Sequence, residues 1–526
     1  MGISDASYRG DFMSTSLFQD SFHERGGCMK KAWEARVLRG KTRWVLSALT
    51  AAVLAACGGG GDGGGRAIPG LAASTALAQR CVAPRSTDAL GTVTDENKWV
   101  QAWNNETYLW YSEVVDHGPT AYNDPVSYFA ALRTTAKTAS GKDKDQFHFT
   151  YDTPTWVALS QGGQSFGYGF NISLIQNTPP RRAVVAYTDP NTPAATNNIL
   201  RGAEILLVDG VDLINDGTQA GVDVLNAGLF PEAAGSHTFR IRDLGGTERN
   251  VTLTAGTLTL VPVQKVGPLP SPNQGVGYIQ FNDHIATSEQ ALIDAIKQLK
   301  TANVTDLVLD MRYNGGGYLD IASELAYMVA GPGATQNKIF EQLQFNDKNP
   351  FGYTAAQRTT PFHTTAQGFS ATDGSALPYL GLSRVYVLAG GDTCSASEAV
   401  VNGLRGVGVN VVLVGNTTCG KPYGFYPKDN CNTTYFTIQF KGVNQAGFGD
   451  YADGFAPTCP VNDDFNHQLG DPAEARLAVA LGHRNTGTCQ PASSTSLAKA
   501  MSADSGSSRG HLVRSALREN RFYRVP

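Results

Sequence analysis

The feature that most constrains the fold of this chain is an alternation of strand-like and helical segments between residues 275 and 481. Short apolar runs are typical of buried strands, and stretches with apolar residues three and four apart are typical of helices. The strand-like runs are 277–281, 307–312, 385–389, 409–414 and, later, 434–440, and the helical stretches are 288–300, 319–329 and 396–404. This alternation predicts an α/β core, which we place within residues 257–490.

Three other regions accompany this core. Residues 81–162 contain a cluster of Trp and Tyr at helical spacing, which predicts an N-terminal helical region with these rings packed inside. Residues 163–256 contain short alternating runs and turns, which predict an inserted β-rich domain. Residues 491–526 are Ser-rich with a basic end, and this composition is typical of disorder.

A reactive constellation is predicted where one strand turns into a helix. Ser395 follows the run 385–389 and precedes the helical stretch 396–404. A serine at such a turn lies beside free backbone N–H groups, which can stabilise an oxyanion. Lys421 follows the next apolar run, 409–414, so it can return to the same sheet edge. A neutral lysine can act as general base for a serine.

Each of these residues also has a structural interpretation. Ser395 and Glu398 fit a helix capping box, and for an isolated pattern of this kind the cap alone would be favoured by about ten to one. Residues 420–422 alone would indicate a turn. A third segment favours the reactive interpretation. The glycines 315–317 follow the strand-like run 307–312, and they would let a backbone N–H approach a substrate closely.

Together, residues 307–317, 393–398 and 414–421 resemble the motifs of the C-terminal processing (tail-specific) peptidases, a family of Ser-Lys serine proteases. The resemblance covers about residues 95–480. It implies a serine-type peptidase that acts on proteins or peptides without a cofactor or metal. Ser395 would be the nucleophile and Lys421 the base, and the backbone N–H groups of Ala396 and Gly316 would form the oxyanion hole. Burial is expected to lower the pKa of Lys421 from its usual value of about 10.4.

The chain departs from the family pattern in two ways. Many members have a glutamine four residues after the lysine, whereas this chain has Phe425. The spacing from serine to lysine is also one residue longer than is usual. The third catalytic group stays open, with Asn402, Tyr423 and Glu398 as candidates.

The inserted domain resembles a PDZ domain. Gly167, Tyr168, Gly169 and Phe170 would stand for its carboxylate-binding loop. PDZ domains bind peptides by strand addition and capture the terminal carboxylate with backbone N–H groups. The resemblance implies that substrates are presented by their C-terminal tails. A small β-rich domain without a ligand is the alternative.

The N-terminus is expected to be a targeting segment. A basic stretch from Met29 to Arg43 precedes an apolar run, 44–56, that ends at Cys57 and resembles a bacterial lipoprotein signal. Residues 1–56 would be removed, Cys57 lipidated, and residues 57–80 left as a Gly-rich tether at the periplasmic side of the outer membrane. A plain membrane anchor is the alternative, but 13 apolar residues are too few to span a bilayer.

Cysteine count and charge bound the remaining chemistry. Besides Cys28 and Cys57, six cysteines are left, and an even number in an exported chain predicts up to three disulfides. We expect Cys419 to pair with Cys431, 12 residues later. No C-x-x-C pair supports a zinc site. A net charge of −4 does not favour a nucleic-acid partner.

Two rival functions stay open from the sequence. One is a non-catalytic lipoprotein that binds peptides through the PDZ-like domain. The other is a hydrolase that uses His284, which follows the first core strand, with Ser395. We expect His284 to be structural, because no acidic motif accompanies it. Asp310 and Arg312 are expected to hold the glycine segment in place.

Overall fold

The computed structural model describes residues 72–490, 511–513 and 521–522. The predicted pre-sequence, the lipidation site Cys57 and the start of the tether lie outside the described residues, as does most of the tail 491–526. Among the residues that are described, no helix is long and apolar enough to cross a membrane.

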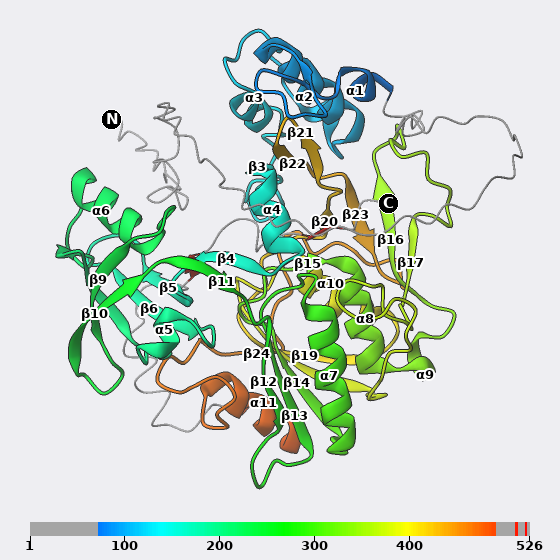
Figure 1. The fold of residues 1–526 in the computed structure, drawn as a ribbon. Helices are drawn as coiled ribbons and strands as arrows, with labels where there is room; N and C mark the ends of the chain where they lie inside the picture. The colour runs from blue at the N-terminus through cyan, green and yellow to red at the C-terminus, as the bar shows by residue number, and fades with distance from the viewer. Residues whose placement is uncertain (1–71, 491–510, 514–520, 523–526) are drawn as a thin grey trace, which may run out of the picture. The chain divides into compact units, whose positions relative to one another are not determined.

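The core is a six-stranded sheet with the order β12-β13-β14-β18-β19-β24 (Figure 1). β12 runs antiparallel to β13, and every other neighbouring pair is parallel. The strands are β12 Val263–Pro268, β13 Val276–Phe281, β14 Asp306–Asp310, β18 Arg384–Ala389, β19 Asn410–Gly415 and β24 Cys459–Pro460. The helices of this layered unit are α7 Ser288–Thr301, α8 Leu319–Ala330, α9 Pro332–Thr335, α10 Ala396–Gly406 and α11 Ala475–Thr486. The predicted α/β core is confirmed.

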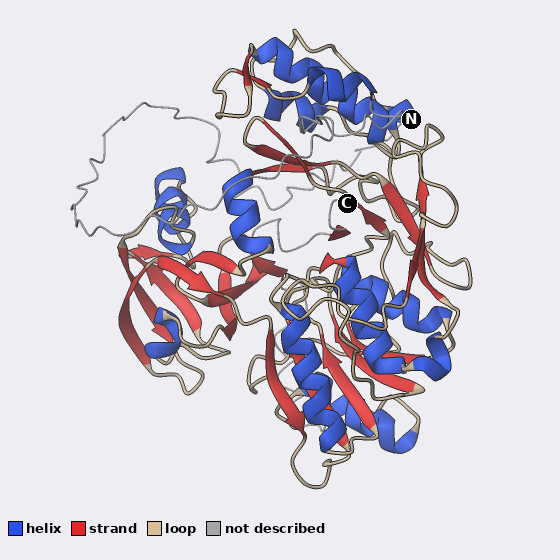
Figure 2. Ribbon diagram, turned by 45° about the vertical axis from the view of Figure 1, so that its right-hand side comes forward, coloured by secondary structure: helices blue, strands red, loops and turns tan. Residues whose placement is uncertain are grey.

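Both faces of the core sheet are covered by helices (Figure 2). Successive residues of a strand point to opposite faces. Leu307 and Leu309 therefore pack in the cluster that contains α7, α8 and α10, whereas Val308 between them packs against α11. Strands buried on both faces have nearly continuous apolar sequences, and this is why the sequence located them within one or two residues.

The N-terminal region is helical and aromatic-rich, as predicted. Its elements are α1 Ala72–Leu77, β1 Arg80–Cys81, β2 Ala89–Leu90, α2 Val93–Thr107, η3 Tyr111–Glu113, α3 Pro125–Ala131, β3 Phe149–Asp152 and α4 Thr153–Ser160. Trp99 and Trp103 of α2 are buried with Phe129 and Tyr435. Tyr435 comes from a distant segment, so this helical region packs on a strand of the C-terminal half.

The predicted strand 434–440 is divided between two sheets. β22 Thr433–Phe436 pairs with β21 Lys428–Asn430 and with β3, whereas β23 Phe440–Val443 pairs with β16 Ile339–Phe345 and β20 Tyr423–Gly424. β17 Thr359–Pro361 completes the second sheet. Between the two strands, the Thr437 hydroxyl donates to Asn104 Oδ1, which draws the chain toward α2. The expectation of one continuous strand was therefore wrong.

Residues 163–256 form the predicted β-rich unit. Its sheet has the order β10-β9-β7-β6-β5, with β8 beside β7. Its elements are β4 Gln164–Gly167, β5 Phe170–Gln176, β6 Arg182–Thr188, α5 Pro193–Thr196, β7 Glu204–Val208, β8 Val211–Asp212, α6 Gln219–Leu229, β9 Ser236–Arg242 and β10 Glu248–Thr254. β4 pairs with β11 Gly256–Thr259, so the chain enters and leaves the unit through one two-stranded ribbon.

The tail 491–526 contains two described strands, marked red on the colour bar of Figure 1. β25 His511–Val513 pairs with β5, and β26 Arg521–Phe522 pairs with β15 Gly317–Tyr318. The prediction of disorder was therefore wrong for these five residues. The low apolar content of the tail signalled no independent structure, but a neighbouring strand edge can order such a segment.

Three disulfides join the described cysteines: Cys81–Cys431, Cys394–Cys419 and Cys459–Cys489. The predicted number is confirmed, but the predicted pair Cys419–Cys431 was wrong. Cys431 lies at the β21–β22 hairpin, which reaches toward the N-terminal region and Cys81. Cys419 lies beside the Ser395 turn, and its sulfur joins Cys394 there.

Candidate active site

Three loops leave the core sheet from the same edge. Asp310 is paired with Leu388 in β14–β18, and Leu388 is paired with Val414 in β18–β19. Because these strands are parallel, their carboxyl ends meet at one edge. The segments that follow are 311–317, 390–395 and 416–421, which hold the glycine turn, Ser395 and Lys421. The predicted convergence of the three motifs follows from this register.

Ser395 occupies the position just before α10, with φ 62° and ψ −115°. A positive φ at a residue other than glycine costs on the order of 1–3 kcal/mol, so surrounding contacts must hold it. The side chain is buried, and its Oγ makes no hydrogen bond with any described residue. A strained serine at a helix start with an uncommitted hydroxyl fits the geometry of a nucleophile.

The Glu398 carboxylate supplies the contacts that hold this turn. One oxygen accepts the backbone N–H of Ser395 (2.9 Å) and that of Lys421 (2.8 Å). The other accepts the Gly420 N–H (2.9 Å) and the Thr418 hydroxyl (2.6 Å). The backbone nitrogens of Ser395 and Lys421 are therefore close together, because both are hydrogen-bonded to the same oxygen atom.

The Glu398 carboxylate is also fully buried. Burial raises its pKa, and the hydrogen bonds from Thr418, Lys421, Ser395 and Gly420 oppose that rise by favouring the charged form. All four of these donors belong to the serine turn or the lysine loop. Of the three candidates for a third group, Glu398 is thus placed as a positioning residue.

A disulfide reinforces the same junction. Cys394 precedes Ser395, and Cys419 lies two residues before Lys421. The Cys419 N–H donates to the Thr393 carbonyl at 3.1 Å, so a backbone hydrogen bond accompanies the covalent link. The serine turn and the lysine loop are therefore joined by the carboxylate, the backbone and the disulfide.

Asn314 ties the glycine turn to the serine turn. Its carbonyl oxygen accepts the Cys394 N–H and the Ser397 hydroxyl, each at 3.0 Å. Its side-chain oxygen accepts the Gly316 N–H at 3.0 Å, and its side-chain nitrogen donates to the Phe281 carbonyl. Asn314 was not predicted to have a role. Its place within the segment 307–317, directly before the glycines, was the signal that could have found it.

The glycine turn has no room for side chains at Gly317. This residue has φ 135°, and a Cβ there would lie 2.3 Å from the His284 carbonyl oxygen. Gly316, with φ 108°, accepts the His284 N–H through its own carbonyl. The predicted oxyanion donor Gly316 N–H is engaged by Asn314. The second predicted donor belongs to Ala396, the first residue of α10, where helical N–H groups have no partner within the helix.

Lys421 is fully buried between aromatic rings. Its Nζ lies 4.3 Å from the centre of the Phe147 ring and 4.4 Å from that of Phe425. Phe425 stands where the family resemblance leads one to expect glutamine. Phe147 comes from the N-terminal helical region, so that region supplies part of the lysine environment, which the sequence did not predict.

The description of peptidase family S41 matches residues 275–427, the segment that carries all three loops, and that of the S41 N-terminal domain matches residues 95–151. The chain contains a peptidase family S41 domain. It is 26% identical over 267 residues to a carboxyl-terminal-processing protease of Picosynechococcus sp., covering 50% of this chain and 56% of the relative. For a protein of the same name from Synechocystis sp., identity is 26% over 268 residues, with 50% and 55% covered.

The chain spans little more than half the length of these two relatives. A crystal structure from Bacteroides fragilis that is assigned to the S41 proteases superposes with a TM-score of 0.57 at 23% identity. It covers 74% of this chain and 97% of that one. This similarity shows a shared fold that includes most of the described chain.

His284 is structural in this S41 fold. Its Nδ1 lies 3.0 Å from Asn314 Oδ1, and its Nε2 is buried without a hydrogen bond to any described residue. Burial lowers the pKa of His284 to about 3, so the ring stays neutral at physiological pH. Since Ser395 Oγ makes no hydrogen bond to it, the geometry does not favour a Ser-His pair.

The other two candidates for the third group lie in different surroundings. Asn402 donates to the Phe448 carbonyl and accepts from Asn444, away from the serine turn. Tyr423 packs edge-on against Trp110, and burial raises its pKa to about 12. Neither residue has a hydrogen bond to Ser395 Oγ.

A buried ionic cluster supports the glycine turn from behind. The Arg312 guanidinium donates to Asp310 at 2.9 Å and to both oxygens of Glu474 at 2.7 and 2.9 Å. It also donates to Asp463, which accepts from the Tyr313 hydroxyl. Asp310 and Arg312 therefore position the chain just before Asn314, as expected from the sequence.

The segment 167–170 forms the turn between β4 and β5 in the β-rich unit. Gly169 has φ 91°, and a Cβ there would lie 2.3 Å from Thr192. Tyr168 is buried and donates to the Gly228 carbonyl of α6, and its ring stacks on that of Phe170. The turn is therefore anchored to the helix and directs the chain into β5.

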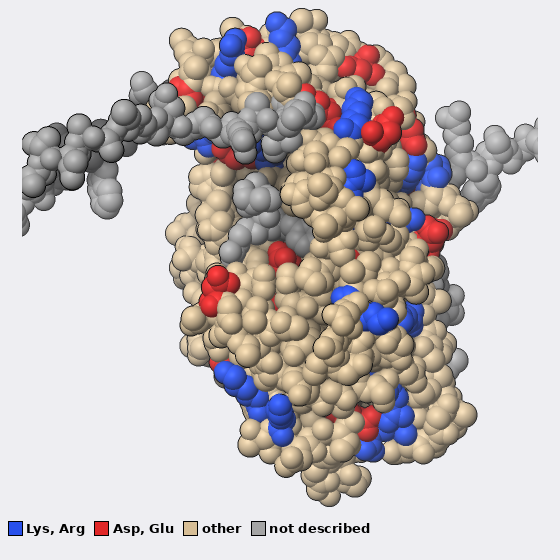
Figure 3. Space-filling view, turned by 90° about the vertical axis from the view of Figure 1, so that its right-hand side faces the viewer, with Lys and Arg blue, Asp and Glu red and all other residues tan. Residues whose placement is uncertain are grey.

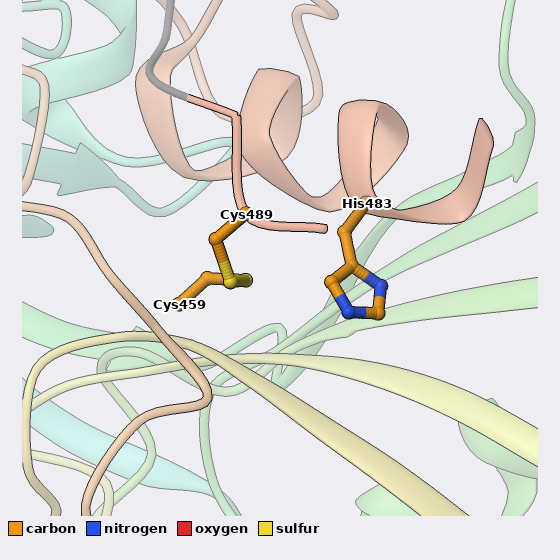
Figure 4. Close-up of side chains that lie close together, drawn as sticks. All are labelled: Cys459, His483 and Cys489. Carbon is orange, nitrogen blue, oxygen red and sulfur yellow. A yellow bond between two sulfur atoms is a disulfide. The ribbon is translucent and has the colours of Figure 1, made fainter. Parts of the chain in front are cut away.

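Among the described residues, three groups place cysteine sulfurs within 4.8 Å of a histidine nitrogen or a glutamate oxygen. Each contains one of the three disulfides, and Figure 4 shows the group of Cys459, His483 and Cys489. A disulfide sulfur is not a thiolate, the form in which cysteine binds metals.

Basic and acidic side chains are interspersed on the face of the described residues in Figure 3.

Proposed function

We propose that this chain is an exported serine endopeptidase of the carboxyl-terminal-processing type, with Ser395 as nucleophile and Lys421 as general base. The observation that carries the proposal is the Glu398 carboxylate, which accepts the backbone N–H groups of both residues on one oxygen. The match of residues 275–427 to peptidase family S41 and the similarity to carboxyl-terminal-processing proteases support it.

The proposed base must be uncharged to accept the Ser395 proton. Complete burial of Lys421 removes its amine from water, and the effective cost of burying an ion is several kcal/mol. Contact with an aromatic face returns about 2 kcal/mol when desolvated. Burial by itself therefore favours the neutral amine that a base requires, and the two ring contacts oppose this effect.

In the proposed reaction, the amine takes the Ser395 proton while Oγ attacks the peptide carbonyl carbon. The resulting oxyanion would accept hydrogen bonds from the Ala396 N–H and from the glycine turn. Gly316 would have to exchange its bond to Asn314 for this purpose, or the N–H of Gly317 would serve. Lys421 then returns the proton to the leaving amine, and water hydrolyses the acyl-enzyme by the same steps.

The Ser395 hydroxyl and the lysine amine are not hydrogen-bonded in the free structure. Catalytic hydrogen bonds are often loose without substrate and tighten when it binds. A fluorophosphonate probe tests the nucleophile directly, because it labels an activated serine covalently. Peptide mapping should place the label on Ser395, and Ser395→Ala should lose both labelling and hydrolysis.

Ser397→Ala is the matched control, because Ser397 lies two residues after Ser395 and donates its hydroxyl to the Asn314 carbonyl. Labelling should persist in that variant. A label on Ser397, or hydrolysis that survives Ser395→Ala, would contradict the proposal. Complete inactivity with retained peptide binding would instead support the non-catalytic peptide-binding function.

Substrate capture is assigned in this proposal to the PDZ-like unit. The turn Gly167, Tyr168, Gly169 and Phe170 opens onto β5, the outer strand of the unit's own sheet. Backbone N–H groups of such a turn can hold a terminal carboxylate. Peptides with amidated C-termini should therefore have a higher KM than the free acids, and equal KM values would argue against tail capture.

The chain is further proposed to be a lipoprotein of the bacterial outer membrane, anchored through Cys57. Cys57→Ser should move the protein from the membrane fraction to the soluble periplasmic fraction. Several acyl chains hold a protein firmly, whereas one binds only marginally, so the shift should be large. Unchanged fractionation would contradict the anchor and leave the peptidase proposal intact.

A further inference from the structure

The C-terminal tail of this chain pairs with the edge of the β-rich unit. β25 lies antiparallel to β5, with His511 opposite Leu174, Leu512 opposite Ser173 and Val513 opposite Ile172. It extends the sheet to β10-β9-β7-β6-β5-β25. β5 begins at Phe170, so the later residues of β25 lie nearer to the Gly167–Phe170 turn. A peptide that binds by strand addition, with its carboxyl end toward this turn, would have the same direction.

Further along, the same tail reaches the candidate active site. β26 pairs in parallel with β15, with Arg521 opposite Gly317 and Phe522 opposite Tyr318. β15 directly follows Gly316. β26 also lies against β20, which begins two residues after Lys421. The strand 521–522 is therefore held between the glycine turn and the lysine loop.

The charge of the tail fits this location. Residues 509–526 contain five arginines and one glutamate, in a chain whose net charge is −4. Beside β20, the carboxylates of Asp450, Asp145 and Asp453 act on Tyr423 and add to the effect of burial in raising its pKa. An arginine-rich peptide is therefore favoured near this strand over an acidic one.

We infer that the C-terminal tail is an internal peptide ligand of this protein, which occupies the strand edges of β5 and β15 in competition with other peptides. The pairing of the tail with β5 and β15 does not depend on the proposed function. Only the statement that the competing peptides are substrates rests on it. Another peptide can bind only to molecules in which the tail has left its strand positions. The apparent affinity of that peptide is therefore its intrinsic affinity multiplied by the fraction of molecules without a bound tail.

Proline substitutions in the full chain test this competition, because proline removes the backbone N–H and cannot donate to a neighbouring strand. Only alternate residues of an antiparallel strand donate to a given neighbour, so both Leu512→Pro and Val513→Pro are needed for β25. Arg521→Pro and Phe522→Pro address β26. Ser507→Pro, outside both strands, is the matched control.

At least one variant of each pair should lower KM for an unrelated peptide substrate with kcat unchanged. The decrease should be about 5-fold if the tail is seated in four of five molecules. The Ser507→Pro control should keep the wild-type KM. Unchanged KM in all four strand variants would overturn the inference.

A binding measurement separates this inference from the peptidase proposal. A fluorescent peptide of residues 509–526 should bind the Leu512→Pro/Phe522→Pro chain more tightly than the wild-type chain. The same peptide carrying both prolines should not bind. Such binding without hydrolysis in any variant would refute the proposed function alone, whereas hydrolysis without binding of the tail peptide would refute the inference alone.

Discussion

At the scale of single residues, the environment of Lys421 is the main departure from the family pattern. Phe425 cannot form the hydrogen bond that a glutamine would, and it instead packs its ring against the amine together with Phe147. Packing against these two rings and burial therefore take part in holding the lysine. Its position depends on the shape of this aromatic site, in which Phe425 is fully buried.

Substitution of Lys421 tests its role as base. Lys421→Met keeps an unbranched apolar chain between the two rings but removes the amine, and Lys421→Arg keeps a permanent charge. Loss of a general base typically costs about 10²–10⁴-fold in rate, so kcat/KM should fall by this amount in both variants. Thermal unfolding should show that Lys421→Met is folded. Substantial hydrolysis by either variant would require another base.

A pair of buried carboxyl groups lies between α7 and α8, with Glu289 on the first helix and Glu324 on the second. Glu324 and Glu289 are fully buried, and both accept the Gln367 N–H. Burial, followed by the charge of Glu289, raises the pKa of Glu324 from 4.5 to about 9. Between these two values the folded state keeps a proton that the unfolded state releases. Stability from this group is therefore present at low pH and falls as pH rises toward 9.

Glu324→Gln removes this ionisation and keeps the shape of the side chain. Its urea midpoint should match the wild type near pH 5 and exceed it near pH 9. Asp294→Asn is the matched control, because the Asp294 carboxylate on α7 is 61% exposed. This substitution should not change the pH dependence. Parallel pH profiles for the wild type and Glu324→Gln would contradict the assignment.

At the scale of elements, the active site depends on two loops that lie at the two ends of the α10–β19 segment. The serine turn precedes α10, the lysine loop follows β19, and the Cys394–Cys419 disulfide joins them. Its sequence separation is 25 residues, for which the chain-entropy model gives about 3–4 kcal/mol. The Cys459–Cys489 disulfide closes a loop of similar length, 30 residues, outside this site.

The two disulfides therefore form a matched pair of experiments. Cys394→Ser/Cys419→Ser should lower both the free energy of unfolding and kcat/KM, because the turn that holds Ser395 loses its covalent link. Cys459→Ser/Cys489→Ser should lower stability by a similar amount and leave kcat/KM near the wild-type value. Denaturant unfolding and peptide hydrolysis measure both. Equal loss of activity in the two variants would mean that stability alone controls the site.

At the scale of the whole described chain, one arginine connects the β-rich unit to the active-site loops. Arg201 donates to Ala186 of its own unit and to the hydroxyl of Tyr313, the residue before Asn314. It also pairs with Asp463, which Arg312 shares. The β-rich unit and the glycine turn are therefore linked through buried hydrogen bonds and charges.

Arg201→Met should break this link. Removing one partner from a buried ion pair typically costs about 3–5 kcal/mol, so the unfolding free energy should fall by that order. The value of kcat should fall as well, because the Tyr313–Asn314 segment loses a support. Arg182→Ala is the control, since Arg182 is an exposed member of a surface pair with Glu204 and should matter little. Wild-type kcat in Arg201→Met would show that the link is not functional.

The α/β core, the β-rich insertion and the three loops that meet at one sheet edge follow from local patterns in the sequence. Strands buried on both faces need continuous apolar runs, and tight turns need glycine, so both leave a local signature. The parallel order of successive strands then brings the ends of these runs together. For the same reason, the sequence indicates Ser395 and Lys421 as candidate site residues.

The contacts between segments distant in sequence could not be predicted from local patterns and are seen only in the folded chain. The disulfide partners, the Phe147 ring over Lys421 and the pairing of the C-terminal tail with β5 and β15 join residues up to several hundred positions apart. Such contacts are set by how packed elements meet, and they leave no periodic pattern in either segment. Asn314 and Glu398 are buried polar residues whose positioning roles follow from the hydrogen-bond donors and acceptors that surround them, which only the folded chain supplies.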